Sequence, residues 1–522
     1  MIYEDYYSIE NGYFYNAEQD KLTQADSSPI QSLSLSLTCR QVASEVRGLA
    51  FRTNTITFST SHSQRTQEAA AVLHATVGEV MHQKHIMIYS LVSQLLTRDM
   101  AELAAKAYPQ FASVFDDWTP QSDIPILYRK NFHCGEAPSV WIDFKHHILD
   151  LMSKHPLFGK RASAITRLWG PDIEYYTLQA NDASSRPYFI PGFIHDVLKL
   201  VSKHVLAVTR ALIIPRLWGS DSVCRATQLT RTSPKPWVIP DPVELKRLAH
   251  IVDVEPTLPF YEPKTKYTYS AASNALRFLR TLPDALRSEI RSLTLLEDHE
   301  SVAYAKCHGR GFIGLCQSNP KLRVKRVVSL WQNAFPVTPE KKMDYILASQ
   351  YPEYMYNVVS DPLLSKHISK ALGAWMAETM ALPSLGMPEG SYRLVFDGAP
   401  TLQHTSDVFK VVQRDIAWQS ALDEAYSRGL LPAPSWLERR LRVGYLYEGL
   451  PNFVQKLSDE ESLITCNFDP GLPFDVAEML EEHRTWTMSD WTRNWDTHEP
   501  REYETEAPLA PWHTIRYQRI FD

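Results

Sequence analysis

The residues of this chain with the clearest capacity for chemistry are a thiol, an imidazole and a carboxylate in its second half. Cys307 and His308 are adjacent, and Asp397 follows a strand-like run, YRLVF, at residues 392–396. A thiol beside an imidazole can act as a nucleophile with its base, and many α/β enzymes place an acid at the end of a strand. If the protein is an enzyme, these three residues are the first candidates for catalysis. The structural alternatives are buried cysteines in a packed loop and an Asp-Gly turn.

Two motifs around Cys307 could hold a ligand. Cys307, His308 and Cys316 offer three soft ligands to zinc, which needs four, and no Cys-x-x-Cys pair occurs in the chain. Residues 309–314 read GRGFIG and match G-x-G-x-x-G, but Asn319-Pro320 ends the helix that a dinucleotide site would require. The sequence therefore predicts neither a bound metal nor a cofactor.

Two groups of basic residues could contact phosphate or another anion. The first group flanks Leu282-Pro283 and the second follows Asn319-Pro320. They consist of Arg277, Arg280, Arg287 and Arg291, and of Lys321, Arg323, Lys325 and Arg326. Arginine binds phosphate oxygens through paired N–H groups. The alternative is a solvated face with local acidic partners, such as Glu289.

Tryptophans gather near the end of the chain among acidic residues. Trp486, Trp491 and Trp495 lie within ten residues of one another, and the last two share one helical face. Exposed tryptophans are favoured anchors at protein interfaces, which makes these three candidates for partner binding. Packing of the rings against the body of the protein is the alternative.

The composition is typical of a folded protein, and its net negative charge does not attract nucleic acid. The 522 residues are 44% hydrophobic and 22% charged, with 54 basic and 60 acidic side chains, so the formal net charge is −6. Nucleic acid is therefore not an expected partner. The longest apolar run, at 85–96, is too short to span a membrane, the first residues are acidic, and the six cysteines are scattered. We expect a soluble cytoplasmic or nuclear protein with reduced thiols.

The predicted secondary structure differs between the two halves of the chain. Residues 1–31 predict a hairpin closed by Asn11-Gly12, followed by a linker from 17 to 31. Residues 32–231 predict a mainly helical region. It comprises a helix from 40 to about 53, a strand at 55–60, two or three helices over 67–115, and helices at 140–153 and 195–214.

The second half predicts a mixed region after a break. Seven prolines between 232 and 263 predict a connector there. Residues 264–522 predict strands at 293–296 and 392–396, and helices at 363–380, 408–427 and 435–442. We expect an α+β fold, with a predominantly helical N-terminal half and a mixed C-terminal half packed as one body.

Several segments resemble a large group of uncharacterised ascomycete proteins, some of them F-box-like. They are LTCRQVASE at 37–45, RTNTITF at 52–58, the run from 276 to 320, ALPSLGMPEG at 381–390 and NFDPGLP at 467–473. The resemblance implies no established reaction. An F-box would begin with a Leu-Pro helix upstream of the CRQ segment, and residues 1–31 contain no Leu-Pro pair.

These observations leave three hypotheses for function. The first is a non-catalytic protein–protein interaction or scaffold protein, because no thiol, imidazole or carboxylate has the spacing that a reaction demands. The second is an enzyme whose site is assembled from distant segments. The third is an F-box-like ubiquitin-ligase adaptor. The interaction protein is the function that we expect, with another protein as its partner.

Overall fold

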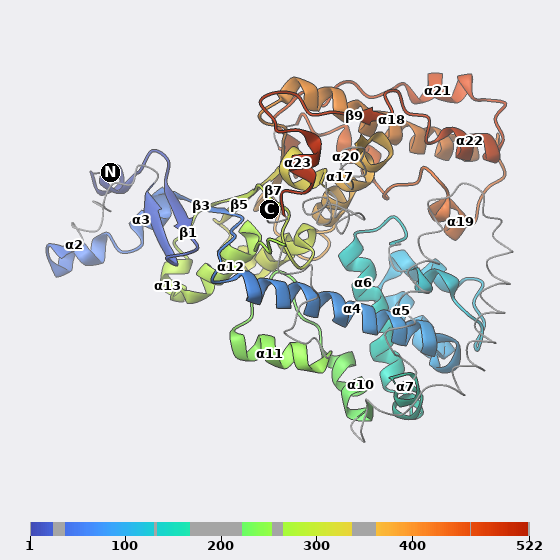
Figure 1. Cartoon of the computed structure of the whole chain (residues 1–522), viewed down its shortest axis with the longest axis horizontal. Helices are drawn as coiled ribbons and strands as arrows, with labels where there is room; N and C mark the ends of the chain where they lie inside the picture. The colour runs from blue at the N-terminus through green and yellow to red at the C-terminus, as the bar shows by residue number, and fades with distance from the viewer. Residues whose placement is uncertain are drawn as a thin grey trace, which may run out of the picture.

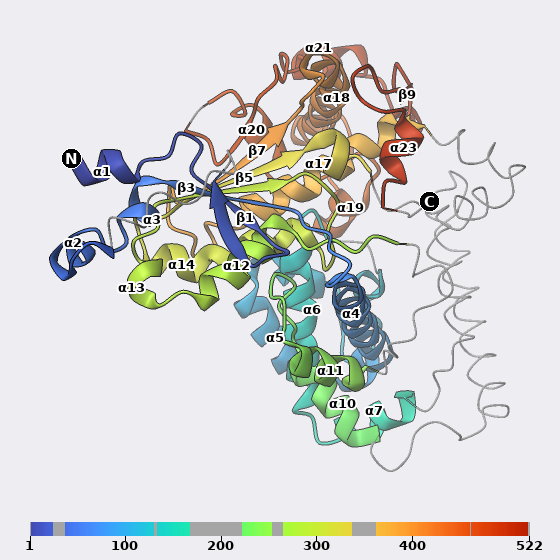
Figure 2. The same cartoon turned by 60° about the vertical axis from the view of Figure 1, so that its left-hand side comes forward.

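A seven-stranded sheet draws its strands from both halves of the chain (Figures 1 and 2). The computed structural model describes residues 2–24, 37–129, 133–166, 222–252, 265–336, 362–459 and 461–519. Within them the strand order is β2-β1-β3-β4-β5-β7-β8, and all neighbours are parallel except β1 and β2. The strands are β1 (Tyr13–Asn16), β2 (Lys21–Gln24), β3 (Thr55–Ser59), β4 (Ser292–Glu297), β5 (Arg323–Ser329), β7 (Tyr392–Asp397) and β8 (Ile464–Cys466). A separate antiparallel pair joins β6 (Leu363–Leu364) to β9 (Glu502–Tyr503).

Helices make up most of the regular structure. Those before β4 are α1 (Ile2–Tyr7), α2 (Arg40–Glu45), α3 (Leu49–Thr53), α4 (Gln67–Leu95), α5 (Arg98–Ala107), η3 (Pro109–Phe115), η4 (Pro125–Tyr128), α6 (Pro138–Ser153), α7 (Phe158–Thr166), α10 (Ser222–Arg231), α11 (Pro242–Ile251), α12 (Ala271–Thr281) and α13 (Asp284–Arg287). Those after β4 are η7 (Ala305–Phe312), α14 (Ile313–Ser318), η8 (Leu330–Ala334), α17 (Ser365–Met380), α18 (Leu402–Ser427), α19 (Trp436–Leu441), α20 (Leu450–Val454), α21 (Val476–Glu482), α22 (Met488–Asn494) and α23 (Trp512–Arg516). This combination of helices with a mixed sheet confirms the α+β class.

The parallel strands follow one another across the sheet in the same order as along the chain. From β1 to β8, every parallel strand lies beside the next one in sequence. A crossover between parallel strands is almost always right-handed, so consecutive crossovers that advance in one direction all lie on the same face of the sheet. This rule predicts helices on one face of the sheet. We call the face with the buried side chains of the described strands the covered face, and the face with their exposed and half-buried side chains the open face.

Buried side chains alternate with exposed or half-buried ones along the strands, as expected for a sheet that is packed on one face. On β4, Leu293, Leu295 and Glu297 are buried, and the residues between them are half-buried. The same alternation holds on β5 and β7, where every second residue is buried. The buried side chains of the covered face are Ile56, Phe58, Leu293, Leu295, Glu297, Val324, Arg326, Val328, Tyr392, Leu394 and Phe396.

Two helices hold the centre of the covered face. Helix α12 contacts β3 and β4, where Phe278 packs against Phe58 with ring centroids 5.7 Å apart. Figure 2 shows α12, α13 and α14 beneath the strands. Helix α17 is buried along most of its length and contacts α18 and η7.

A group of helices extends from the sheet between β3 and α12. Helix α4 spans 29 residues and packs against α6, α7 and α11 (Figure 1). Phe111, Trp141 and Phe144 are buried and form an aromatic centre for this group. Glu378 of α17 accepts hydrogen bonds from the backbone and side chain of Ser139 at the start of α6, at 2.7 and 2.6 Å, and so joins the helical group to the sheet. In the described residues no helix is both long and apolar enough to cross a bilayer.

The N-terminal hairpin lies one element later than predicted. The hairpin is β1–β2, its turn is at 17–20, and the residues before Asn11-Gly12 form α1. The side chain of Asn16 accepts hydrogen bonds from the backbone N–H groups of Glu18 and Gln19, both at 3.0 Å, which folds the turn locally. The predicted linker from 17 to 31 is therefore wrong for residues 17–24, and its remainder lies outside the described residues.

Two further predictions about helices need correction. The single helix predicted after Thr38 is divided into α2 and α3, because Gly48 has φ 74° and a side chain there would collide with Glu289. The predicted connector at 232–263 contains α11, which Asp241 caps and in which Pro242 occupies the first turn, where its missing N–H is harmless. The predicted helix at 195–214 lies outside the described residues.

The other elements agree with the sequence. The strand predicted at 55–60 is β3, those at 293–296 and 392–396 are β4 and β7, and the helices over 67–115 and 140–153 are α4 to η3 and α6. The helices predicted at 363–380, 408–427 and 435–442 are α17, α18 and α19. These segments have strong periodicity, which explains their agreement.

Candidate functional site

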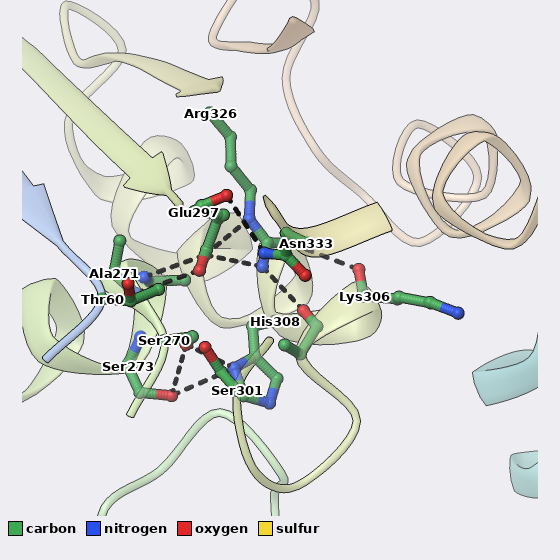
Figure 3. Close-up of polar contacts among 12 residues, drawn as sticks. Thr60, Ser270, Ala271, Ser273, Glu297, Ser301, Lys306, His308, Arg326 and Asn333 are labelled. Atoms are coloured by element: carbon green, nitrogen blue, oxygen red, sulfur yellow. Dashed lines mark hydrogen bonds and ion pairs between the residues drawn. The ribbon is translucent and has the colours of Figure 1, made fainter. Parts of the chain in front are cut away.

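A buried ion pair lies on the covered face between the central strands β4 and β5, near the carboxyl end of β4 (Figure 3). Glu297 of β4 and Arg326 of β5 have side chains exposed by 0% and 1%. Arg326 donates from Nη2 and Nε to Glu297 Oε1, at 2.7 and 2.9 Å, and its guanidinium lies over the ring of Trp375. Two charges are stable at such depth only if their remaining hydrogen-bonding groups are also satisfied.

The helix that begins beside Glu297, α12, provides two of the hydrogen bonds to its carboxylate. The backbone N–H groups of Ala271 and Ala272, in the first turn of α12, donate to the carboxylate at 3.1 and 3.3 Å. A helix N-terminus stabilises negative charge, so α12 is held in place by the carboxylate. Arg326 also donates to the Ala305 carbonyl at 2.7 Å, and Asn333 donates to the Glu297 carbonyl at 3.0 Å. The ion pair thus ties β4, β5, α12, η7 and η8 together.

His308, one of the catalytic candidates, belongs to the same buried region. Its Nε2 lies 2.7 Å from the Ala303 carbonyl, which can only accept, so Nε2 carries the proton. The unprotonated Nδ1 is then the acceptor for a serine hydroxyl, and it lies 2.7 and 3.0 Å from the Ser270 and Ser273 oxygens. Burial lowers the pKa of His308 to about 3, and the charge of Arg326 acts in the same direction. The imidazole of His308 is therefore neutral, and both of its nitrogens have hydrogen-bonding neighbours. Because Ser270 is fully buried as well, we assign His308 a structural role.

Cys307 and Asp397 do not join His308. Cys307 is 5% exposed and its thiol donates to the Tyr304 carbonyl at 3.2 Å. Burial raises the pKa of the Cys307 thiol, so the nucleophilic thiolate is disfavoured. Asp397 lies on the open face, opposite His308, and accepts from Ala399 N and Asn467 Nδ2 at 2.9 and 2.6 Å. The structure therefore does not bring the three catalytic candidates together.

The ligand motifs around Cys307 have a packing role. The G-x-G-x-x-G segment forms η7 and α14, and a side chain at Gly309 or Gly311 would collide with Tyr392 or with Leu276 and Trp237. Burial raises the pKa of the Cys316 thiol, as it does for Cys307. In the part of the chain that the structure describes, no three His, Cys, Asp or Glu side chains are close enough to hold a metal ion.

The first group of arginines is largely engaged with neighbours. Arg277 donates to the Tyr15 hydroxyl at 2.8 Å and lies 3.8 Å from Asp20. Arg287 pairs with Asp284, and Arg291 lies 3.4 Å from Glu289. Arg280 is exposed on α12. Anion contact at these four residues stays a prediction, and at three of them an anion would compete with a carboxylate already present.

The C-terminal tryptophans surround another tryptophan in the core. Trp491 and Trp495 are 1% and 4% exposed, and their rings lie 4.9 and 6.0 Å from that of Trp418 on α18. Their burial excludes them as exposed anchors and agrees with the alternative of packing against the body. Trp486 is half-buried and stacks on His483 with ring centroids 3.7 Å apart. Of the three, Trp486 alone retains some exposed surface.

The open face presents two rows of side chains that run across the strands. In a parallel sheet, residues in register on neighbouring strands share a face. The first row is Phe14, Thr57, Thr294, Lys325 and Arg393. The second row is Ser59, Leu296, Val327, Val395 and Thr465. All of these residues are exposed or half-buried except Thr57, which is small and 8% exposed.

Strand alternation divides the second group of basic residues between the two faces. Arg326 points to the covered face and pairs with Glu297, whereas Arg323 and Lys325 are exposed on the open face. Arg393 of β7 lies directly opposite Lys325 and is also exposed. Sequence reasoning treated the basic run as one group and missed this division. The three valines in RVKRVVS at 323–329 are the signal that could have revealed a strand, because β-branched residues favour strands.

A cavity lies beside the carboxyl ends of β3 and β4. Its volume is about 300 Å³, and residues from four distant segments line it. They are Thr60, His62, Lys266, Thr268, Asp298, His299, Gln518 and Arg519. Asp298 accepts from Thr60 and lies 3.6 Å from His299, and Arg519 pairs with Glu300 at 2.6 Å. The Lys266 ammonium group, which also lines the cavity, donates to the Gln518 carbonyl at 3.2 Å.

Comparison of the chain with protein-family models, with curated proteins and with solved structures found no match in any of the three. The function of the chain is therefore inferred from the geometry of its described residues.

Replacement of Trp491 by alanine tests the position of the tryptophan cluster. The loss of a fully buried indole should lower the free energy of unfolding by about 3–5 kcal/mol. Arg493→Ala, on the exposed side of α22, is the matched control and should change it by less than about 0.5 kcal/mol. Chemical denaturation monitored by tryptophan fluorescence and circular dichroism gives both values. Equal stability of the two variants would contradict the buried cluster.

The buried imidazole of His308 predicts a specific acid sensitivity. Its pKa is lowered on folding, so the unfolded state binds more protons and stability falls as the pH drops below about 6.5. Between about pH 7 and about pH 5 this one group should remove about 2 kcal/mol from the free energy of unfolding. His308→Asn retains an acceptor for the serines without this titration, so its unfolding free energy should fall by that much less over the same interval. Parallel pH dependences would show that His308 titrates normally in the folded protein.

Proposed function

We propose that this chain is a non-catalytic interaction protein that binds another protein on the open face of its sheet. The observation that carries the proposal is the uneven burial of the parallel strands: in the described residues, one set of alternating side chains on β4, β5 and β7 is buried and the other set is exposed or half-buried. Parallel sheets are almost always covered on both faces, because their strands are rich in apolar residues. A parallel sheet with an accessible face therefore offers a rigid surface for a partner.

The composition of the open face supports a protein partner. The second row carries Leu296, Val327 and Val395 side by side, and the first carries polar and charged groups. Interfaces between proteins combine an apolar centre with a polar rim in this way. The backbone of every strand is fixed by its neighbours, so the surface needs no ordering before it binds.

The reactive groups give less support to an enzyme. Cys307 and His308 are buried and hydrogen-bonded, and Asp397 fixes a turn with Asn467. The cavity at the ends of β3 and β4 favours the enzyme hypothesis as a second candidate, since α/β enzymes often bind ligands at the carboxyl ends of parallel strands. Turnover of a small molecule, abolished by Asp298→Asn without loss of stability, would support that candidate.

The F-box-like adaptor and the cytoplasmic or nuclear location remain proposals of lower rank. The described thiols Cys39, Cys134, Cys307, Cys316 and Cys466 are free, which suits a reducing compartment. The adaptor rests on the resemblance of the CRQ segment alone. Recovery of a cullin-adaptor complex with the purified chain would support it.

Substitution of the apolar row tests the proposed surface. Val327→Thr combined with Val395→Thr keeps the β-branched shape and replaces two methyl groups by hydroxyls. A partner seated on this row should bind about tenfold more weakly, because each hydroxyl loses apolar contact and requires a new hydrogen bond. Affinity purification with quantitative mass spectrometry identifies the partner, and calorimetry with the isolated partner measures its Kd.

The matched control is Val243→Thr, at a valine that is 80% exposed on α11, remote from the open face. It should bind the partner as the unaltered chain does, and all three proteins should keep the same Tm within about two degrees. If the Val327→Thr/Val395→Thr variant retained full affinity for every reproducible partner, the open face would not be the binding surface.

A further inference from the structure

Two cations stand directly opposite each other on the open face. Lys325 of β5 and Arg393 of β7 are register partners on neighbouring strands, and both are exposed. Neighbouring strands are about 4.8 Å apart, so these side chains lie side by side. Arg323, two residues before Lys325 on the same face, adds a third exposed cation.

This arrangement is unfavourable for the isolated protein. Like charges directly opposite each other on neighbouring strands destabilise a sheet. In the described residues, Arg323, Lys325 and Arg393 form no ion pair with a carboxylate, whereas Arg439 contacts both Asp423 and Glu448. The chain has 60 acidic side chains against 54 basic ones, so acids are not scarce elsewhere. Positive charge is therefore concentrated at one end of the open face, and the Asp397 carboxylate lies beyond the apolar row, where it accepts from Ala399 and Asn467.

We propose that the open face binds an acidic, partly apolar segment of a partner protein, an inference that rests on the proposed function. Carboxylates of the segment would pair with Lys325, Arg393 and Arg323. Its aliphatic side chains would pack on Leu296, Val327 and Val395, which are two residues further along the same strands. Two residues of a strand span about 6.6 Å, a separation that a single segment covers with neighbouring side chains.

The surroundings of the cations favour a carboxylate-bearing protein over nucleic acid. Leu296, Val327 and Val395 beside them are aliphatic, and the aromatic ring in the two rows, Phe14, lies three strands away from Lys325. Single-stranded nucleic acid is usually held by several aromatic rings that stack on successive bases. A duplex would bring many phosphates near a chain with net charge −6, whereas the strands of the described open face carry three exposed cations, of which Arg323 already donates to the Pro320 and Leu322 carbonyls. A short acidic segment engages these three cations and brings little further negative charge.

A model peptide tests the inference directly. A fluorescein-labelled peptide of Glu-Glu-Leu-Leu repeats is titrated with the full chain, and binding is followed by fluorescence anisotropy at about 50 mM and about 200 mM salt. We expect binding that weakens as salt rises, because exposed ion pairs are screened. Lys325→Gln with Arg393→Gln should raise the Kd by about tenfold or more. A peptide of Lys-Lys-Leu-Leu repeats should not bind.

The control removes the same charge elsewhere. Lys410→Gln, on α18, with Arg428→Gln, directly after α18, neutralises two exposed cations that already have acidic neighbours, and should leave the Kd unchanged. Lys325→Glu with Arg393→Glu should reverse the preference, so that the Lys-Lys-Leu-Leu peptide binds and the acidic peptide does not. Equal loss of affinity in the control variant, or tighter binding of a labelled oligothymidylate than of the acidic peptide, would overturn the inference.

The Tm of an Arg393 variant distinguishes a binding role from a structural one. Arg393→Gln removes the repulsion with Lys325, so it should raise the Tm by about one degree. A clear fall in Tm would show that Arg393 stabilises the fold and would count against a binding role.

The outcomes also separate this inference from the proposed function. A cellular partner that is lost with Val327→Thr/Val395→Thr but retained with Lys325→Gln/Arg393→Gln would leave the open face as an interface and overturn the acidic segment alone. A partner that tolerates both double substitutions would overturn both.

Discussion

The right-handed crossover is the constraint on which this architecture depends. The parallel strands from β1 to β8 follow the order of the chain, and right-handed crossovers between strands in such an order all return on the same side of the sheet, where the buried side chains of the described strands lie. A sheet whose strand order reversed midway would receive helices on both faces. One choice of strand order thus produces both the buried core and the exposed surface proposed for binding.

The same basic run shows how the sheet assigns opposite roles to neighbouring residues. Lys325 and Arg326 are adjacent, but one is exposed beside Arg393 and the other is buried against Glu297. The buried pair is satisfied by the first turn of α12 and by the carbonyl of Ala305, so it ties the elements that meet there. The exposed pair lacks such partners, and its repulsion is offset only when an anion binds.

The periodic elements could be predicted from the sequence, and the role of most candidate site residues could not. Strands β3, β4 and β7 and helices α4, α6, α17 and α18 agree with local apolar periodicity. Strand β5 was missed because its open-face positions carry cations, and charge obscured the alternation. Cys307 and His308 could be interpreted as catalytic or as structural residues. Burial distinguishes the two interpretations, and it depends on segments that are remote in sequence.

By itself, the sequence determined the α+β class and the main periodic elements, because these depend on composition and on neighbours along the chain. The tertiary structure decided which side of each strand faces the helices. It thereby decided that Trp491 and His308 serve the core and that Lys325 and Arg393 are left at the surface. The physical reason is that register and crossover hand place residues side by side that are far apart in the chain, and local patterns carry no record of those contacts.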